Sequence, residues 1–299
     1  MRKLKQIVTA VRTSDGAGVS LYRSLGQSPH ARVDPFLMLD EFGSDQPNEY
    51  IAGFPPHPHR GFETVTYMLE GHMLHEDHLG NKGHLKSGDV QWMTAGRGII
   101  HSEMPQQEEG LMRGFQLWIN LPAKEKMKPA AYQDIAAAEL PSLDTPQGLR
   151  VKVIAGDLSR NGQAITGPIR GVSTEPIFFD VHCPAGLCFE EALPPEHNVY
   201  VYVYEGELVA NLESSLDQEL KAKQGGVFSA GDALCLCAGV AATKFLLLAA
   251  KPLNEPVVQH GPFVMNTREE IEQAIADYRS NKLVQISLRS CNVDCAFVV

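Results

Sequence analysis

Short runs of β-branched, aromatic and aliphatic residues recur along this chain, and they constrain its fold more than any other feature. Turn-forming residues separate the runs, as in Ser14-Asp15-Gly16 and Leu79-Gly80-Asn81. We expect strands over Gln6–Arg12, Thr64–Leu69, Val90–Met93, Gly114–Ile119, Leu149–Ile154, Ile177–Val181 and Val199–Tyr204. This spacing is typical of an all-β barrel or sandwich and not of alternating β and α units.

Helix is predicted mainly near the end of the chain. Thr267 and Glu270 have the spacing of a capping box, in which each side chain accepts a hydrogen bond from the other residue's backbone N–H. The residues that follow place an apolar face on a short helix that runs to about Arg279, formed by Ile271, Ala274, Ile275 and Tyr278. A second short helix is expected around Tyr132–Glu139.

A faint internal repeat indicates two copies of one β unit. Similar segments lie in the same order in both halves: Pro55–His59, Tyr67–Gly71 and Ser87–Asp89, then Pro194–His197, Tyr202–Gly206 and Ala230–Asp232. Prolines interrupt regular structure near residues 122–148, where the copies would join. We therefore predict an N-terminal domain over residues 1–128 and a C-terminal domain with the helix and tail over residues 129–299, each of ordinary size.

Charge and hydropathy exclude several classes of partner. The net charge of −10 would repel a phosphate backbone, so direct nucleic-acid binding is not expected. The longest wholly apolar run, Phe245–Ala250, is far too short to span a membrane. The basic N-terminus is followed by residues too polar for a signal peptide. We expect a soluble, cytoplasmic protein.

The cysteines all follow residue 180, in the pairs Cys183/Cys188, Cys235/Cys237 and Cys291/Cys295. These spacings match no zinc ribbon. Cys235 and Cys237 share one face of a predicted strand, where small buried apolar side chains are expected rather than metal ligands. No disulfide framework is expected in a reducing compartment.

Two His/Glu-containing segments carry the predicted chemistry. His57 and His59 stand two residues apart, so on a strand both imidazoles point to one face, and continuing by twos reaches Glu63. His101 and Glu103 have the same spacing after a glycine-rich turn. Two antiparallel strands inside a barrel would direct both pairs inward. Neutral imidazoles with a carboxylate suit one Fe(II), Ni(II), Cu(II), Mn(II) or Zn(II) ion.

Longer segments resemble a known family. HPHRGFETVTYMLEG (residues 57–71), GDVQWMTAGRGIIHSEMP (residues 88–105) and DPFLMLDEF (residues 34–42) are similar to the pirin family of bicupins. The resemblance implies two tandem cupin domains, which are jelly-roll-like β-barrels, followed by the short helix. It also implies that His57, His59, His101 and Glu103 bind one metal ion, usually iron.

The resemblance further implies that Glu63 is not a direct ligand, although spacing alone leaves it open. It implies that the C-terminal cupin has lost its metal site. The sequence agrees, because Glu196-His197 lacks the His-x-His pattern and Cys235–Gly239 lacks the His-x-Glu pattern.

Two functions are compatible with this metal site. Prokaryotic members of the family suggest a dioxygenase of quercetinase type that opens a flavonol-like aromatic substrate with O₂. There Glu103 would also accept the substrate's hydroxyl proton as a general base. Eukaryotic members suggest the alternative, a non-catalytic, redox-responsive regulator that acts through a protein partner. A closed bicupin is expected to be a monomer.

Other features have simpler explanations. His72, His75, His78 and His84 crowd one predicted hairpin, where we expect partly exposed residues around the turn and not a second metal site. By strand parity Arg60 points away from the metal and is expected to form a structural ion pair. Trp92, Met93 and Phe115 are expected in the core. The end of the chain departs from the family in an apolar stretch over Cys291–Val299, which would form an extra strand or a disordered tail.

Overall fold

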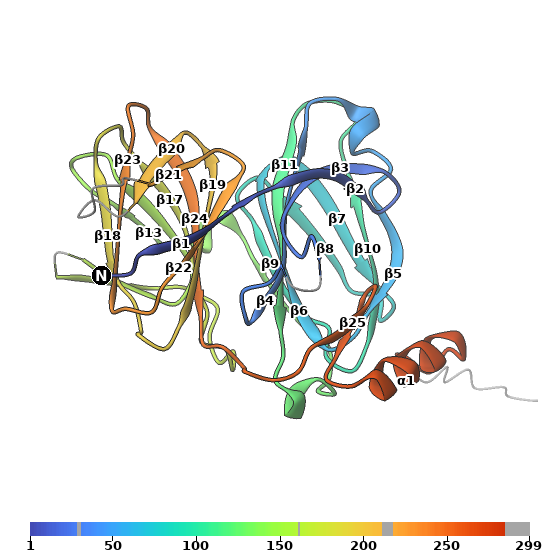
Figure 1. Cartoon of the computed structure of the whole chain (residues 1–299). Coiled ribbons are helices and arrows are strands. Elements are labelled where there is room, and N and C mark those ends of the chain that lie inside the picture. Colours follow the sequence, from blue (N-terminus) through green and yellow to red (C-terminus); the bar gives the residue numbers. More distant parts are fainter. Residues whose placement is uncertain (29–30, 161, 211–217, 285–299) are drawn as a thin grey trace, which may run out of the picture.

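The computed structural model describes residues 1–28, 31–160, 162–210 and 218–284. It shows two β-barrels side by side, with one helix packed against the first of them (Figure 1). The predicted all-β bicupin fold is confirmed. The apolar segment over Cys291–Val299 lies outside the described residues.

In the described N-terminal barrel, a seven-stranded sheet faces a four-stranded one. In spatial order the larger sheet contains β12 (Ala131–Ile135), β9 (Val90–Thr94), β6 (Phe62–Glu70), β11 (Met112–Asn120), β4 (Phe36–Ser44), β3 (Val19–Leu25) and β2 (Val11–Asp15). The smaller contains β5 (Phe54–His59), β10 (Ile99–Pro105), β7 (His72–Asp77) and β8 (Lys82–Lys86).

The C-terminal barrel repeats this plan over its described residues. Its larger sheet contains β1 (Leu4–Thr9), β22 (Gln224–Phe228), β19 (Asn198–Glu205), β24 (Thr243–Ala250), β17 (Ile177–Cys183), β14 (Arg150–Ala155) and β13 (Ser142–Asp144). Its smaller sheet contains β18 (Cys188–Ala192), β23 (Ala233–Ala238), β20 (Glu207–Ala210) and β21 (Gln218–Lys221). Two hairpins complete the strands: β15 (Asp157–Arg160) with β16 (Gln163–Thr166), and β25 (Val258–His260) with β26 (Phe263–Met265).

Every strand predicted from the sequence is present, but one of them is divided. The run Gln6–Arg12 separates at Ala10 into the end of β1 and the start of β2. β1 pairs with β22 in the C-terminal barrel, whereas β2 pairs with β3 in the N-terminal barrel. The strand pattern therefore located the extended residues but not the barrel to which each belongs.

The internal repeat is confirmed as two copies of one β unit, with one error in its alignment. Gly71 and Gly206 each follow equivalent strands, β6 and β19. Gly88-Asp89 precedes β9, whereas Gly231-Asp232 precedes β23, the counterpart of β10 by pairing order. A Gly-Asp pair marks a turn without identifying which turn, so the second correspondence was wrong.

Helix α1 spans Arg268–Arg279 as predicted, and Thr267 caps it through the expected reciprocal bonds with Glu270. The predicted helix over Tyr132–Glu139 is wrong. Those residues form β12 and a 3-10 turn, η3 (Ala137–Glu139), because the free edge of β9 offers backbone partners. The other short turns are η1 (Pro47–Glu49) and η2 (Ala123–Glu125). Within the described ranges, no helix is long and apolar enough to cross a membrane.

The two ends of the chain cross between the barrels (Figure 1). β1 completes the C-terminal sheet, while β26 returns to the N-terminal barrel, where Phe263 bridges to Arg60. The Arg60 guanidinium forms an ion pair at 2.7 Å with Asp277 of α1, as the sequence predicted. The proposed division between residues 128 and 129 stays a prediction. β1 precedes it in the sequence but pairs in the C-terminal barrel, whereas β12 and β26 follow it but lie against the N-terminal barrel.

The larger sheets of both barrels pack on each other through a shared apolar core. From the N-terminal barrel it takes side chains such as Val65 and Phe115, and from the C-terminal barrel Phe178 and Leu248. Trp92 and Phe115 belong to this core and Met93 to a smaller cluster, so their predicted core role is confirmed.

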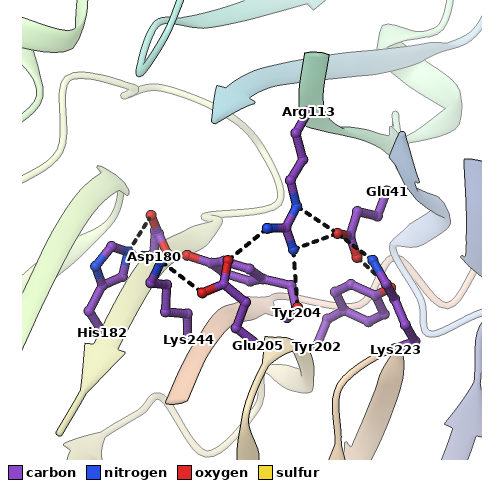
Figure 2. Close-up of polar contacts among 9 residues, drawn as sticks. All are labelled: Glu41, Arg113, Asp180, His182, Tyr202, Tyr204, Glu205, Lys223 and Lys244. Atoms are coloured by element: carbon purple, nitrogen blue, oxygen red, sulfur yellow. Dashed lines mark hydrogen bonds and ion pairs between the residues drawn. The ribbon is translucent and has the colours of Figure 1, made fainter. Parts of the chain in front are cut away.

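A buried polar network lies within that contact, as Figure 2 shows. Glu41, only 1% exposed, accepts hydrogen bonds from Arg113 of its own barrel and Tyr202 of the other, and pairs with Lys223 at 2.6 Å. Arg113 also pairs with Glu205 across the contact at 2.7 Å. The network connects the barrels by charge as well as by apolar packing.

Asp180 occupies a similar position on the C-terminal side of the contact. It accepts hydrogen bonds from Tyr204 at 2.6 Å and, across the contact, from Tyr67 at 2.7 Å. Burial alone would raise the pKa of Asp180, but bonds from His182 and the two tyrosines outweigh it, so the pKa is lowered. An ionised carboxylate therefore accepts these bonds inside the contact.

The expectation of no disulfide is wrong for one pair. Cys188 on β18 lies directly opposite Cys237 on β23, with Cα atoms 3.9 Å apart, and the two are bonded. Strand register decides this pairing, and Cys spacing does not reveal register. Cys235, opposite Glu190, is partly exposed, and Cys183 is buried with a free thiol. Cys291 and Cys295 lie outside the described residues.

Candidate metal centre

Three imidazoles converge inside the N-terminal barrel. β5 carries His57 and His59, and its antiparallel partner β10 places His101 directly opposite His57. The ring centroid of His57 lies 4.7 Å from that of His59 and 4.3 Å from that of His101. One ring nitrogen from each residue lies within 4.8 Å of the others. Metal–nitrogen bonds are about 2.1 Å long, so small side-chain rotations bring this group to bonding distance.

The Glu103 carboxylate lies near His101 but is not part of the group of ligand atoms formed by His57, His59 and His101. A bulge in the β5–β10 register follows His101, so Glu103 pairs with Phe54 on one side and with His75 on the other. Its carboxylate accepts hydrogen bonds from Thr66 Oγ1 at 3.0 Å and from Gln116 Nε2 at 3.1 Å. The ligand roles of the three histidines and Glu103 stay a prediction, now with all four side chains in one neighbourhood.

His59 and His101 are in the neutral protonation state that a metal cation requires of its histidine ligands. Burial lowers the pKa of His59 and of His101 well below the usual range, and neighbouring imidazoles lower both further. Both rings are therefore neutral and carry one lone pair each. His59 Nδ1 and His101 Nε2 are buried and have no hydrogen-bond partner. Leaving such atoms unpaired costs about 1–3 kcal/mol each, which a coordinated metal ion would offset.

A cavity of about 590 Å³ opens onto this group. Its wall includes His57, His59 and Glu103. Apolar side chains form much of the rest of the cavity wall, including Leu37, Met38, Phe42, Phe54 and Trp118. Arg23 and Asp40 form a polar corner, joined by two hydrogen bonds of 2.8 and 2.6 Å. The combination of apolar walls and few polar groups is typical of a small-molecule site.

Glu63 lies outside the centre, and the parity argument that brought it near the ligands was wrong. The chain leaves β5 at His59, turns through Gly61, whose φ is +92°, and starts β6 at Phe62. Strand alternation therefore does not continue from His59. The Glu63 carboxylate accepts hydrogen bonds from Thr94 at 2.6 Å and Trp92 at 3.2 Å. It has a structural role between β6 and β9.

His75 is the residue of the site that the sequence interpretation missed. It was expected at the exposed end of a hairpin, but it is 2% exposed and lies on β7 opposite Glu103. His75, His101 and Glu103 also form a group whose ligand atoms lie within 4.8 Å of one another. The signal was present in the alternation of β7, since the neighbouring buried position Met73 has the same parity as His75. His72 and His78 are partly exposed and His84 is exposed, in agreement with the prediction for these three.

The corresponding strand pair of the C-terminal barrel has different chemistry. β18 and β23 direct Phe189, Leu234 and Leu236 into an apolar core. His197 lies in the loop after β18 and not on a strand. Apolar side chains thus fill most of the interior that the histidines occupy in the first barrel, with the buried Glu191 of β18 opposite Leu234.

Comparison with known proteins agrees with this architecture. Residues 18–119 match the sequence model of the family "Pirin". Residues 178–284 match that of the "Pirin C-terminal cupin domain". A protein of Pseudomonas aeruginosa, provisionally named a quercetin 2,3-dioxygenase, is 52% identical over 94% of this chain and 98% of its own length. Human pirin is 39% identical over 94% of this chain and 93% of its own.

A solved structure resembles the whole described molecule. Quercetin 2,3-dioxygenase from Acinetobacter baumannii superposes with a TM-score of 0.86 at 34% sequence identity, over 96% of this chain and 99% of the other. Both cupin domains and their connection are therefore shared. On the fold, the two matched domains and these relatives, the chain belongs to the pirin family.

Proposed function

We propose that this protein is a metal-dependent dioxygenase of quercetinase type, which opens a flavonol-like aromatic substrate with O₂. The observation that carries the proposal is the cavity of about 590 Å³ whose wall includes His57, His59 and Glu103. A group of imidazoles beside a substrate-sized cavity, two of which have a buried ring nitrogen without a hydrogen-bond partner, suits catalysis better than a purely structural ion. Similarity to quercetin 2,3-dioxygenase from Acinetobacter baumannii supports the same reaction class.

In this proposal His57, His59, His101 and Glu103 hold one divalent metal ion, Fe(II) by preference. When bound, a redox-active ion supplies the Lewis acidity and one-electron chemistry that reaction of an enol with O₂ requires. The protein supplies the neutral imidazoles, the cavity and the proton acceptor. These contributions follow from its own side chains.

Glu103 is the proton acceptor. A substrate that presents adjacent hydroxyl and carbonyl oxygens to the site would lose its hydroxyl proton to a Glu103 carboxylate oxygen. Thr66 and Gln116 hold that carboxylate in place by hydrogen bonds from β6 and β11. Its orientation is therefore set before the substrate arrives, which avoids an entropic cost during reaction.

The apolar wall orients the substrate. Phe42, Phe54 and Trp118 line the cavity beside the histidines, and aromatic faces pack well on planar rings. A ring seated there also displaces water from the neighbourhood of Glu103. The substrate class that fits is a planar, largely apolar molecule with a few hydroxyl groups.

The direct test is O₂ consumption with quercetin, using protein purified without oxygen and reconstituted with Fe(II). We expect uptake that is absent from a His57→Ala/His59→Ala variant. No uptake by wild-type protein that binds one equivalent of metal would reject the dioxygenase proposal for this substrate. A search for protein partners would then test the regulatory alternative.

The Glu103→Gln variant tests the base. Glutamine keeps the shape of the side chain and an oxygen able to coordinate, but it cannot take a proton at neutral pH. We expect kcat with quercetin to fall by about 10²- to 10⁴-fold, the usual contribution of a general base, while metal content falls much less. Glu108→Gln, the same change at an exposed carboxylate, is the matched control. Undiminished turnover in Glu103→Gln would remove Glu103 from this role.

A further inference from the structure

A row of polar side chains crosses the inner face of the larger N-terminal sheet. Gln116 on β11 lies directly opposite Thr66 on β6 and, on its other side, opposite Asp40 on β4. Asp40 in turn lies opposite Arg23 on β3. Residues directly opposite on antiparallel strands point to the same face, so the four side chains form one line. Its first two members hold the Glu103 carboxylate by hydrogen bonds.

The row leads from the candidate metal centre to the polar corner of the cavity. Glu103, Gln116, Asp40 and Arg23 all line this cavity. Neighbouring strands are about 4.8 Å apart, so the backbone of Asp40 lies roughly 5 Å from that of Gln116, and the backbone of Arg23 roughly 10 Å from it. A substrate with its reacting end at Glu103 therefore reaches Asp40 with a ring at its opposite end.

Asp40 is a charged acceptor in an apolar part of the wall. It is 2% exposed and stands on β4 between Met38 and Phe42, which line the same cavity. Among the described side chains only Arg23 hydrogen-bonds this carboxylate, through two bonds, whereas an ionised carboxylate accepts about four. Burial raises the pKa of Asp40 to about 6, against the hydrogen bonds and charge of Arg23, so the group is mostly ionised at neutral pH. Asp40 therefore keeps acceptor capacity for a donor on a bound molecule.

The corner carries a net negative charge. Arg23 also donates to Asp15, an exposed carboxylate at the end of β2, at 2.8 Å. One guanidinium thus faces two carboxylates. Together with Glu103 these are the acidic and basic side chains among the described residues that line the cavity. A hydroxyl group that donates to Asp40 is favoured by this arrangement, whereas a carboxylate in the same place is repelled.

We propose that Asp40, held in place by Arg23, is a specificity-determining residue that recognises a hydroxylated ring at the end of the substrate farthest from Glu103 and rejects a carboxylated one. The substrate class is then a neutral phenolic molecule with hydroxyl groups at both ends. The inference rests on the proposed function, because that function places the reacting end of the substrate at Glu103. It adds the recognition of the other end.

Two flavonols that differ only in the outer ring test this recognition by equilibrium binding. Quercetin carries two hydroxyl groups on that ring, and galangin carries none there. The full-length protein is reconstituted with Zn²⁺, which has no redox chemistry, and kept under nitrogen. We expect quercetin to bind about 10- to 100-fold more tightly than galangin, the usual contribution of a hydrogen bond to a charged group.

The Asp40→Asn variant keeps the shape of the side chain but loses the charge and part of the acceptor capacity. We expect it to lower the ratio of the two affinities by about 10-fold. Asp45→Asn, the same change at an exposed aspartate outside the cavity wall, is the matched control and should keep the wild-type ratio.

A carboxylated probe tests the charge of the corner. We expect 4′-carboxy-3-hydroxyflavone to bind the wild-type protein about 10-fold more weakly than 3-hydroxyflavone, because two carboxylates already face that end of the cavity. Asp15→Asn removes one of these charges at an exposed position and should reduce the discrimination. This variant keeps the inference testable if Asp40→Asn does not fold.

Several results would overturn the inference. They are equal affinities of the wild-type protein for quercetin and galangin, binding of neither, an unchanged ratio in folded Asp40→Asn, and tighter binding of the carboxylated probe than of 3-hydroxyflavone. Failure of the proposed function is measured separately. O₂ uptake by the Fe(II) protein with an unchanged binding ratio rejects only the role of Asp40, whereas a lowered ratio without O₂ uptake rejects only the dioxygenase.

Discussion

Replacing His101 with alanine is expected to remove the bound metal almost completely. His101 lies opposite His57 on β10 and belongs to both groups of potential ligand atoms, so no arrangement of the remaining side chains replaces it. Loss of a direct ligand should weaken binding by more than the about 10- to 100-fold that supporting residues contribute. The measurement is metal content after reconstitution with one equivalent of Fe(II), together with the dissociation constant for Co²⁺.

The fold should largely survive this change. The two barrels are held by their own apolar cores and by the contact between their larger sheets, none of which needs the ion. His72→Ala, which changes a partly exposed histidine on β7 outside both groups of potential ligand atoms, is the control and should retain the metal. Full metal occupancy in a folded His101→Ala protein would contradict the proposed ligand set.

Replacing Glu41 with alanine is expected to destabilise the protein by about 1–3 kcal/mol, because the buried Tyr202 hydroxyl loses its acceptor and Lys223 loses its carboxylate. Glu41 is 1% exposed, accepts hydrogen bonds from Arg113 at 2.9 Å and from Tyr202 at 2.9 Å, and forms an ion pair with Lys223 at 2.6 Å. In the variant the two cations would face each other across the contact between the barrels. Chemical denaturation of the metal-free protein measures the free energy of unfolding.

The control is an ion pair between two solvent-exposed side chains. Asp144→Ala removes the partner of Arg150 at the exposed end of β13, where such pairs contribute at most about 1 kcal/mol. The double variant Glu41→Ala/Arg113→Ala should be less destabilised than the sum of the single changes, since each single change already removes the same Glu41–Arg113 interaction. Equal effects of Glu41→Ala and Asp144→Ala would show that the network does not connect the barrels energetically.

Local patterns of the sequence predicted much of the fold. Runs such as Thr64–Leu69 and Val199–Tyr204 are strands because their residues suit a pleated surface buried on both faces. The capping box at Thr267 starts the helix at the predicted residue. The His57/His59 and His101/Glu103 pairs were found because a strand directs alternate residues to the same side.

Predictions failed where pairing across the chain outweighs local preference. Residues 132–135 form a strand because they pair with the backbone of β9 at the edge of the sheet. Cys188 is bonded to Cys237 because the strand register places the two residues opposite each other. Glu63 leaves the metal face because the chain turns at Gly61. These partners lie far apart in the sequence, so no local pattern reveals their pairing.

The sequence by itself determined that this chain forms two β-barrels and that the first contains a histidine cluster, because alternation and turn chemistry are properties of neighbouring residues. Only the tertiary structure decided which barrel receives β1 and that His75 lies beside His101. It also decided that Glu41 is the charged centre of the contact between the barrels. These features depend on strand register and on packing between distant segments, which bring together side chains that the sequence keeps far apart.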